Sequence, residues 1–431
     1  MTAVVFAATS LLVIIAGAWA SRLSAIARLD RRARIAIVFA IGCIIAAVLM
    51  FIESLLGMPW DRVSLGSPLF FLALAAPPML WRDTSNESPW MWTDTATLLL
   101  IALTTYAAMN ARETNGDLIH FWGPKAQQFH LTGRIDTDFL GFQHYYLMHP
   151  DYPPLVPLVY AWASLGSHNF SWWGALLLTP MFLWVTVESF RGLARDAIGP
   201  ERASQLALLL AAVLTFGFAQ GRAAGGADPP LIMFETIALA ALTFAGDRWS
   251  GIVVAALALG GASWTKFEGA AFAVAIVLAF AIVKRRPLAA FVLAIPSLAL
   301  LGSWIAFADA HHLLDAYAAN RGAFNAGAIP MVLFECLKSA SYGFFFLPWI
   351  AAAAPLLRTR RWRAAALPLL VAVLVLGYTI FFYLHGADPR WWIRTSADRV
   401  LLTALMCIVI ASAAAMPPPE SRDRSVTRMP F

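Results

Sequence analysis

The sequence predicts an all-α protein built as a polytopic bundle of transmembrane helices. Of its 431 residues, 60% are hydrophobic and only 13% are charged, and the mean hydropathy is +0.69. A soluble protein of this size could not hide so much apolar side chain. The apolar residues also fall into segments of about 20, the length at which a helix crosses a bilayer core of roughly 30 Å.

Thirteen apolar segments are predicted to span the membrane. Their approximate bounds are 3–20, 35–56, 67–81, 94–110, 172–190, 203–220, 229–245, 250–264, 269–284, 287–307, 341–357, 364–385 and 399–416. The segment 153–166 is apolar as well. We interpret it as a re-entrant or interfacial helix, because a fourteenth crossing would turn every later basic cluster outward.

Basic residues between the segments predict the orientation. Clusters of arginine and lysine lie at 21–34, 284–286 and 358–363 and in the tail after Met416. With an external N-terminus and thirteen crossings, all four clusters face the cytoplasm, as the positive-inside rule requires. The same count puts these segments outside: 111–153, 221–228, 265–268, 308–330 and 386–398.

The cysteines carry no functional signal. Cys43, Cys336 and Cys407 all lie in apolar segments, so we expect packing residues there and no disulfide framework.

The predicted external loop 111–153 collects carboxylates, histidines, a lysine and aromatic residues. Loops of this length without obvious secondary structure are usually functional. Its first group is Asp117, His120, Trp122 and Lys125, and helical spacing would put Asp117 and His120 on one face. Asp117 could deprotonate an acceptor hydroxyl or amine. The alternative is a solvated carboxylate that caps a juxtamembrane helix.

The loop closes with a proline-rich corner, HPDYPPL. Its prolines prevent a continuous helix and fix an extended entry into the next apolar segment. His149 and Tyr152 would therefore be presented at a rigid corner. They are candidates for substrate binding. The alternative is that this corner only ends the loop and begins the next helix.

Two further external turns carry ionisable residues. Asp228 follows two glycines and precedes Pro229 and Pro230, so it either caps the next helix or forms a two-carboxylate site with Asp117. Such a pair could hold a divalent cation or share acid–base work. In SWTKFEG, Lys266 could meet a phosphate, or it could be neutralised locally by Glu268.

The segment Ala387–Arg399 combines three arginines with two tryptophans. Tryptophans are ordinary anchors at a membrane interface, but external arginines run against the positive-inside trend. Guanidinium groups bind phosphate in a bidentate manner, so a lipid phosphate or diphosphate would explain Arg394 and Arg399. Arg399, at the head of the last predicted span, is the strongest candidate.

In this order, these residues resemble the GT-C glycosyltransferases of membranes. That group includes protein O-mannosyltransferases and the bacterial aminoarabinose transferases of lipid A. The likeness comprises Asp117 followed by FWGPKAQQFHLTG, the Pro-Pro-Leu entry at Tyr152–Leu155 and the second external acid Asp228. Lys266 with Glu268, and TSADR, resemble segments of bacterial relatives of unassigned substrate. The resemblance covers the chain from about residue 94.

The resemblance implies a GT-C helical bundle whose sugar donor is linked to polyprenyl phosphate and whose acceptor is a glycan, lipid or protein. Asp117 would be the catalytic base, and Asp228 its partner at the acceptor site or at a divalent cation. The donor phosphate would be held by Lys266, Arg394 and Arg399. The remaining substrate contacts would come from His120, Trp122, Lys125, His149, Tyr152 and Glu268.

The chain departs from the family in two features. Gly116 and Leu118 flank Asp117 where some subfamilies have a further acid, and no large soluble domain follows the last span. Metal dependence and a protein acceptor therefore stay open.

The expected organisation is a three-span N-terminal region (1–93), the GT-C-like core (94–416) and a disordered cytoplasmic tail (417–431). The expected location is a bacterial inner membrane, with the site facing the periplasm and no nucleic-acid partner. The alternatives are a transporter or flippase of lipid-linked sugars, a polysaccharide ligase and a non-catalytic scaffold. A transporter would place ionisable residues near the bilayer midplane, on broken helices in repeated halves.

Overall fold

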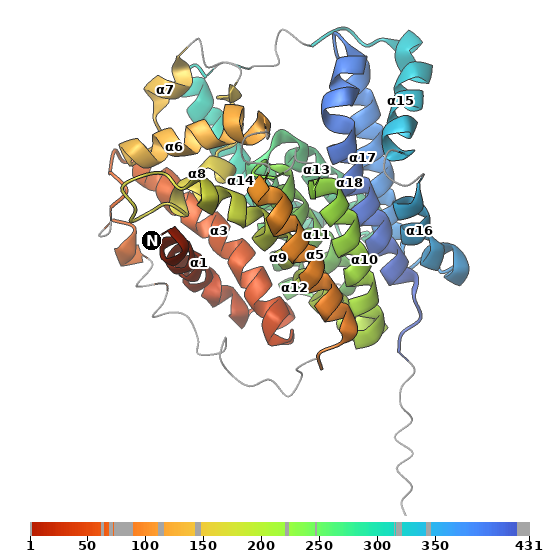
Figure 1. Ribbon diagram of the computed structural model, residues 1–431. Coiled ribbons are helices and arrows are strands. Elements are labelled where there is room, and N and C mark those ends of the chain that lie inside the picture. The colour runs from red at the N-terminus through yellow and green to blue at the C-terminus, as the bar shows by residue number, and fades with distance from the viewer. Residues whose placement is uncertain are drawn as a thin grey trace, which may run out of the picture.

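The computed structural model describes residues 2–61, 64–68, 72, 89–110, 116–142, 148–219, 224–245, 248–313, 315, 321–341 and 346–419. Within these ranges the chain is helical and contains no β-strand, so the all-α prediction is confirmed (Figure 1). The predicted span 67–81 and the predicted tail 417–431 lie almost entirely outside the described residues.

The described part of the chain contains the following helices in order. They are α1 (Thr2–Gly17), α2 (Ser24–Ala27), α3 (Arg31–Leu55), α5 (Trp92–Asn110), α6 (Gly123–Thr132), α7 (Thr137–Gly141), α8 (Leu155–Trp162), α9 (Trp172–Ile198), α10 (Pro200–Ala219), α11 (Asp228–Phe244), α12 (Trp249–Thr265), α13 (Phe267–Lys284), α14 (Pro287–Ala310), α15 (Ile329–Ser341), α16 (Leu347–Thr359), α17 (Ala366–Leu384) and α18 (Pro389–Ala415). Shorter turns are the 3₁₀ segments η1 (Ala18–Arg22) and η6 (Ala326–Ala328) and the π-helical turn η3 (Leu118–Trp122).

Among the described residues, seven helices are long and apolar enough to cross a membrane. They are Val4–Arg22, Arg31–Leu55, Trp172–Ile198, Phe267–Lys284, Pro287–Ala310, Ala366–Leu384 and Pro389–Ala415. Each overlaps a predicted span, and the apolar helix α12 is slightly shorter. Helices α5, α10 and α11 also lie on predicted spans. The chain therefore has the helices of a multi-pass membrane protein.

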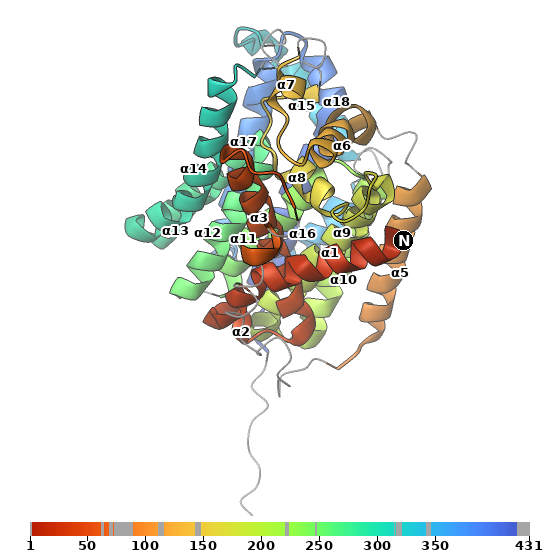
Figure 2. The ribbon, with the colours of Figure 1, turned by 90° about the vertical axis from the view of Figure 1, so that its left-hand side faces the viewer.

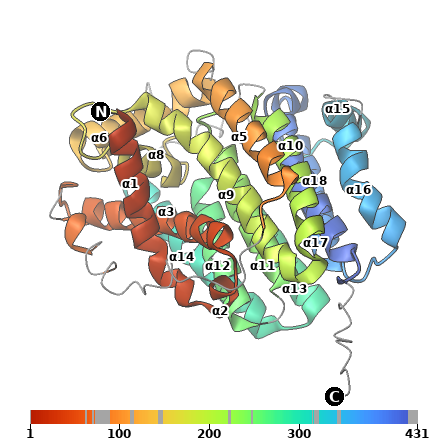
Figure 3. The same ribbon diagram turned by 60° about the horizontal axis from the view of Figure 1, so that its bottom comes forward.

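The long helices form a row of neighbours around α9. Helix α9 packs against α3, α5, α10 and α11, and α10 leads on to α18, which packs against α16 and α17 (Figure 3). The N-terminal helices belong to the same core, since Gly192 of α9 lies so close to α3 that a Cβ there would stand 2.2 Å from Ala33 Cβ. Figure 2 shows α6 and α7 at one end of the bundle and α2 at the other.

A buried ion network ties the α2 end of the bundle together. Arg191 of α9 lies 2.8 Å from Asp30, which caps α3, and 2.7 Å from Glu188. Arg32 of α3 reaches Asp94 of α5 at 3.4 Å. Because an unpaired buried charge is costly, these contacts fix how the three helices align.

The helix that carries the last predicted span is longer than that span. The predicted span covers 399–416, with 386–398 outside the membrane, whereas α18 begins ten residues before the span, at Pro389. The Asp388 side chain accepts hydrogen bonds from the backbone N–H groups of Arg390 (3.0 Å) and Trp391 (3.2 Å), and Pro389 suits the first helical turn. Residues 389–398 are therefore helix, and Arg399 lies within α18.

The segment around the predicted span 341–357 also differs. Helix α15 ends at Ser341, and α16 covers only 13 residues, Leu347–Thr359. Helix α8, within the apolar segment 153–166, has 8 residues, all buried. At about 1.5 Å per residue it is roughly 12 Å long, too short to cross a bilayer.

Candidate functional site

Five ionisable side chains form one continuous contact chain. Arg399 contacts the Asp117 carboxylate, and its Nη1 lies 3.1 Å from Oδ2 of Asp228. The other oxygen of Asp228, Oδ1, lies 3.2 Å from Lys266 Nζ, and the same ammonium lies 3.2 Å from Oε1 of Glu268. We call the series Asp117–Arg399–Asp228–Lys266–Glu268 the charge chain. Sequence analysis had selected all five residues.

The charge chain is buried at its centre and open at its ends. The Asp228 and Lys266 side chains are 7% and 10% exposed, whereas those of Asp117 and Glu268 are 24% and 29% exposed. A ligand can therefore reach the two terminal carboxylates more readily than the central pair. Three carboxylates and two cations give the chain one net negative charge before any ligand binds.

Lys266 occupies a sharp corner between two helices. It is the single residue between α12 and α13, and its backbone is extended, with φ −162° and ψ 154°. Gly269 makes the corner possible, because a Cβ there would stand 2.0 Å from the carbonyl oxygen of Ala262. Burial alone would lower the pKa of Lys266, but Asp228 and Glu268 outweigh burial and raise this pKa, so the ammonium stays charged.

Asp117 is positioned by the π-helical turn η3. This turn, Leu118–Trp122, follows Asp117 directly and leads into α6. π-Helical turns often occur at functional sites, where the extra residue per turn redirects side chains. Leu118 is fully buried, and it packs where a Cβ on Gly225 would come within 2.9 Å of its side chain. Gly225, with φ +72°, thus brings the turn before α11, and with it Asp228, close to the Asp117 turn.

A second group of predicted residues, which we call the aromatic cluster, consists of Trp122, Lys125, His149 and Tyr152. The Lys125 ammonium donates a hydrogen bond to the His149 carbonyl (3.0 Å) and lies 4.5 Å from the Trp122 ring centroid. The rings of His149 and Tyr152 stack at 5.0 Å. Tyr152 also meets Phe267, whose neighbours in the chain are Lys266 and Glu268, at 5.1 Å. The aromatic cluster therefore adjoins the charge chain.

Burial changes the ionisation of both basic groups in the aromatic cluster. It lowers the pKa of Lys125 to about 7, against the opposing effect of the Asp151 carboxylate. Burial also lowers the pKa of His149 to about 3, helped by the positive charges of Lys125 and Lys266. The imidazole is neutral near pH 7, whereas Lys125 changes its charge in that region.

Two predicted residues, His120 and Arg394, belong to neither the charge chain nor the aromatic cluster, and both are exposed. His120 is exposed, on the π-helical turn beside Asp117. Arg394 is exposed on α18, five residues before Arg399. Five residues correspond to a rotation of about 140° around a helix, so the two arginines face different directions.

The arrangement does not fit a divalent cation between Asp117 and Asp228. Arg399 contacts both carboxylates, and Lys266 takes the second oxygen of Asp228. No group of three or more His, Cys, Asp or Glu residues suited to a metal occurs in the described part of the chain. Guanidinium and ammonium groups supply the positive charge that a metal would provide in a two-carboxylate site.

Sequence analysis missed Glu235 and Thr403, which continue the polar contacts into the bundle. Glu235 lies two turns after Asp228 on α11, and its Oε2 accepts a hydrogen bond from Thr403, one turn after Arg399 on α18, at 2.7 Å. Glu235 is 1% exposed. The sequence did contain a sign of this role, because Glu235 is a lone acid within an apolar predicted span. An ionisable residue inside a membrane span is by default a candidate functional residue.

Fold and site together define a multi-pass helical membrane protein with a chain of alternating charges at one end of its bundle. No family model, curated protein or solved structure matches the chain.

Proposed function

We propose that the protein is an integral membrane glycosyltransferase of the GT-C type with about thirteen spans. It would move a sugar from a polyprenyl phosphate to a glycan, lipid or protein acceptor of the cell envelope. The observation that carries this proposal is the charge chain, because it combines a partly exposed carboxylate with two cations suited to phosphate. Its members come from four separate parts of the sequence.

Arg399 and Lys266 are the residues that would bind the donor phosphate. The Nε atom of Arg399 is buried and has no hydrogen-bond partner among the described residues. A buried donor left unpaired is costly, and a phosphate oxygen would satisfy it. A phosphate on this guanidinium would also compete with Asp117 for it, which would release the carboxylate for chemistry when the donor is bound.

The reaction needs one base and one stabilised leaving group. The acceptor hydroxyl oxygen forms a bond to the anomeric carbon while its proton passes to Asp117. The bond from that carbon to the phosphate oxygen breaks, and its electron pair stays on the phosphate, where Arg399 and Lys266 balance the charge. Attack opposite the leaving group inverts the anomeric configuration. The protein contributes mainly positioning and electrostatic stabilisation.

The aromatic cluster would form the wall against which the sugar or acceptor packs. Tyr152 is the natural contact, because its ring lies between His149 and Phe267 and so adjoins the charge chain. Aromatic faces bind the apolar face of a sugar ring, whereas its hydroxyl groups require polar partners. Glu268, which is partly exposed and has one buried oxygen without a partner among the described residues, is such a partner.

The site would face the periplasm of a bacterial inner membrane. Support comes from the two ends of the bundle. Asp117 of the charge chain leads through η3 into α6, whereas Arg22, Arg28 and Arg32 flank α2 in the chain. Figure 2 shows α6 and α2 at opposite ends of the bundle. Basic residues are retained on the cytoplasmic side.

The decisive experiment measures sugar transfer by the purified, full-length protein. Mass analysis of lipid-linked sugars from cells with and without the protein first identifies the donor that accumulates. With that donor, Asp117→Asn should reduce the transfer rate by about 10²–10⁴-fold, the usual contribution of a general base. The matched control is Asp138→Asn on α7, which removes a carboxylate outside the charge chain. Transfer at the wild-type rate by Asp117→Asn would refute the proposal.

One observation favours the flippase alternative. Glu235 and Thr403 place a carboxylate inside the bundle, where transporters keep ionisable groups. A flippase would move the lipid-linked sugar across the membrane without breaking the bond to phosphate. Donor that crosses the bilayer of proteoliposomes intact, with no free polyprenyl phosphate formed, would decide for that alternative.

A further inference from the structure

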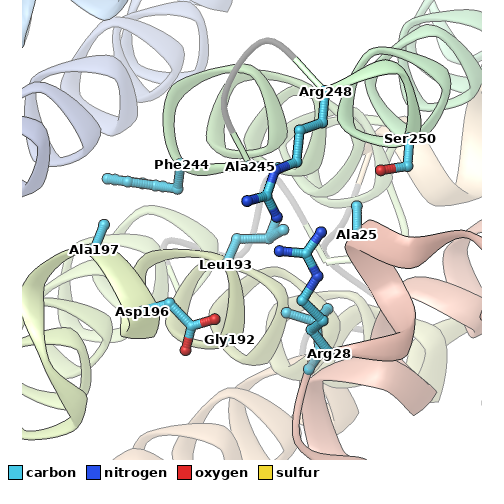
Figure 4. A pocket seen from close by; sticks show the side chains of 11 residues that line it. Ala25, Arg28, Gly192, Leu193, Asp196, Ala197, Phe244, Ala245, Arg248 and Ser250 are labelled. Carbon is cyan, nitrogen blue, oxygen red and sulfur yellow. The ribbon is translucent and has the colours of Figure 1, made fainter.

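A second site candidate lies at the α2 end of the bundle. A cavity of about 370 Å³ opens between α2, the end of α9, the end of α11 and the start of α12. We call it the α2 pocket. Figure 4 shows Arg28 and Arg248 reaching into it from opposite sides, with their guanidinium groups pointing toward one another. Its walls are mostly apolar and include Leu193 and Phe244.

Neither arginine is neutralised within the described part of the chain. Arg28 donates from Nε to the carbonyl of Ser24 at 3.1 Å, and no ion pair involves Arg28 or Arg248 there. Among the described residues that line the pocket, the carboxylate is Asp196, which is 70% exposed and lies 3.7 Å from Nε of Arg195. No carboxylate of the described residues pairs with Arg28 or Arg248, so the two converging guanidinium groups repel each other, and a bound anion removes that repulsion.

The start of α12 adds a second feature that favours an anion. Arg248 is the N-cap residue of this 17-residue helix and forms no side-chain cap hydrogen bond. The first N–H groups of a helix have no partner inside it, and the positive end of the helix dipole attracts negative charge. Ser250, in the first turn of α12, shares a hydrogen bond with Ser24 of α2 at 2.8 Å, which fixes α2 beside the pocket.

The α2 pocket is separate from the charge chain. Helix α12 contributes Ser250 of its first turn to the pocket and ends at Thr265, beside Lys266. With a rise of about 1.5 Å per residue, the two sites are roughly 25 Å apart along this helix. That distance approaches the thickness of the hydrocarbon core, which supports a placement of the two sites at opposite leaflets.

We propose that the α2 pocket binds the phosphate of an anionic phospholipid headgroup in the leaflet opposite the charge chain. Two guanidinium groups and the start of α12 would hold the phosphate, and the apolar walls would hold the glycerol and upper acyl carbons. Basic pockets between transmembrane helices bind anionic headgroups in this manner. The inference does not depend on the transferase proposal.

The experiment measures lipid retained by the full-length protein in nanodiscs made from equal parts phosphatidylglycerol and phosphatidylcholine. After release into detergent, native mass spectrometry counts the bound phospholipid. The test variant is Arg28→Gln with Arg248→Gln. The matched control is Arg358→Gln with Arg363→Gln, which removes two exposed arginines near the α16–α17 connection. In a parallel arm, inorganic phosphate is titrated while the thermal midpoint is followed.

Wild type and control should each retain phosphatidylglycerol in preference to phosphatidylcholine, and the test variant should bind it at least about tenfold more weakly. Equal retention by all three proteins would overturn the site. A thermal shift with inorganic phosphate that wild type and control show and the test variant lacks, without lipid retention, would overturn the lipid assignment and identify a free phosphate site in the α2 pocket. If the double variant does not fold, Arg248→Gln alone serves, because its side chain forms no hydrogen bond among the described residues.

Discussion

At the residue scale, the candidate site depends on where charges are buried. Lys125 is 2% exposed, with its ammonium between the His149 carbonyl and the Trp122 ring. The cost of burying this charge lowers the pKa of Lys125 to about 7. In an unfolded chain the pKa of a lysine is about 10.4. Folding and proton release are therefore linked at this position.

This linkage predicts how stability varies with pH. Between pH of about 7 and about 10.4 the unfolded chain keeps a proton on Lys125 that the folded protein has released, so stability rises with pH across this window. The stability gained from deprotonation of Lys125 in the folded protein is complete above the unfolded pKa and is lost as pH falls toward 7. Lys125→Met removes it. Thermal midpoints from pH 6.5 to pH 10 should therefore rise more steeply for wild type than for the variant, and parallel curves would contradict the linkage.

The composition of the charge chain could be predicted at this scale, but its pairing could not. Residue type and the predicted membrane side selected Asp117, Asp228, Lys266, Glu268 and Arg399. The sequence left open whether Lys266 pairs locally with Glu268 or meets a phosphate. In the structure Lys266 contacts both Glu268 and Asp228. The contact between Asp117 and Arg399 joins residues 282 positions apart, and no helical spacing encodes such a contact.

At the element scale, apolar runs identified most helices because membrane helices must satisfy their backbone groups internally. The ends of the helices were less predictable. The start of α18 depends on the Asp388 cap, and the π-helical turn at Leu118–Trp122 depends on tertiary packing. Capping and packing decide where an element begins, whereas hydropathy reports only its middle.

The corner between α12 and α13 gives a test at this scale. Gly269→Ala would bring a Cβ within 2.0 Å of the Ala262 carbonyl, so the two helices must separate and move Lys266. We expect a loss of about 1–3 kcal/mol in stability, typical of overpacking, together with reduced sugar transfer. The control is Gly302→Ala on α14, where a Cβ would meet nothing within 4 Å. That change should stabilise by about 0.5–1 kcal/mol through helix propensity.

Thermal midpoints in detergent, measured with transfer rates, test both substitutions. A Gly269→Ala protein as stable and active as wild type would mean that the corner does not position Lys266. An equal loss in Gly302→Ala would mean that any added methyl group disturbs the bundle.

At the scale of the whole molecule, the bundle has two chemically different ends. One end carries the charge chain and the aromatic cluster, and the other carries Arg28 directly after α2, the arginines at the start of α3 and the α2 pocket. Sequence analysis predicted this division from the count of spans and the positions of basic clusters. It could not predict the α2 pocket, because three segments far apart in the chain form its walls.

Labelling of single cysteines tests the orientation. The background is Cys336→Ser, since Cys43 and Cys407 are fully buried. One reporter is Leu131→Cys on α6, where the native side chain is 60% exposed, and the other is Trp362→Cys between α16 and α17, where it is 46% exposed. In intact bacterial spheroplasts, a membrane-impermeant maleimide should label position 131, because α6 lies at the end predicted to face the periplasm. Position 362 should react only after the membrane is permeabilised, because it lies within a basic cluster that the positive-inside rule holds in the cytoplasm.

The control for the reactivity of each reporter cysteine is its labelling after the membrane is permeabilised. Labelling of position 362 in intact spheroplasts, with position 131 protected, would reverse the orientation. The charge chain would then meet cytoplasmic substrates, and a periplasmic transferase would be excluded.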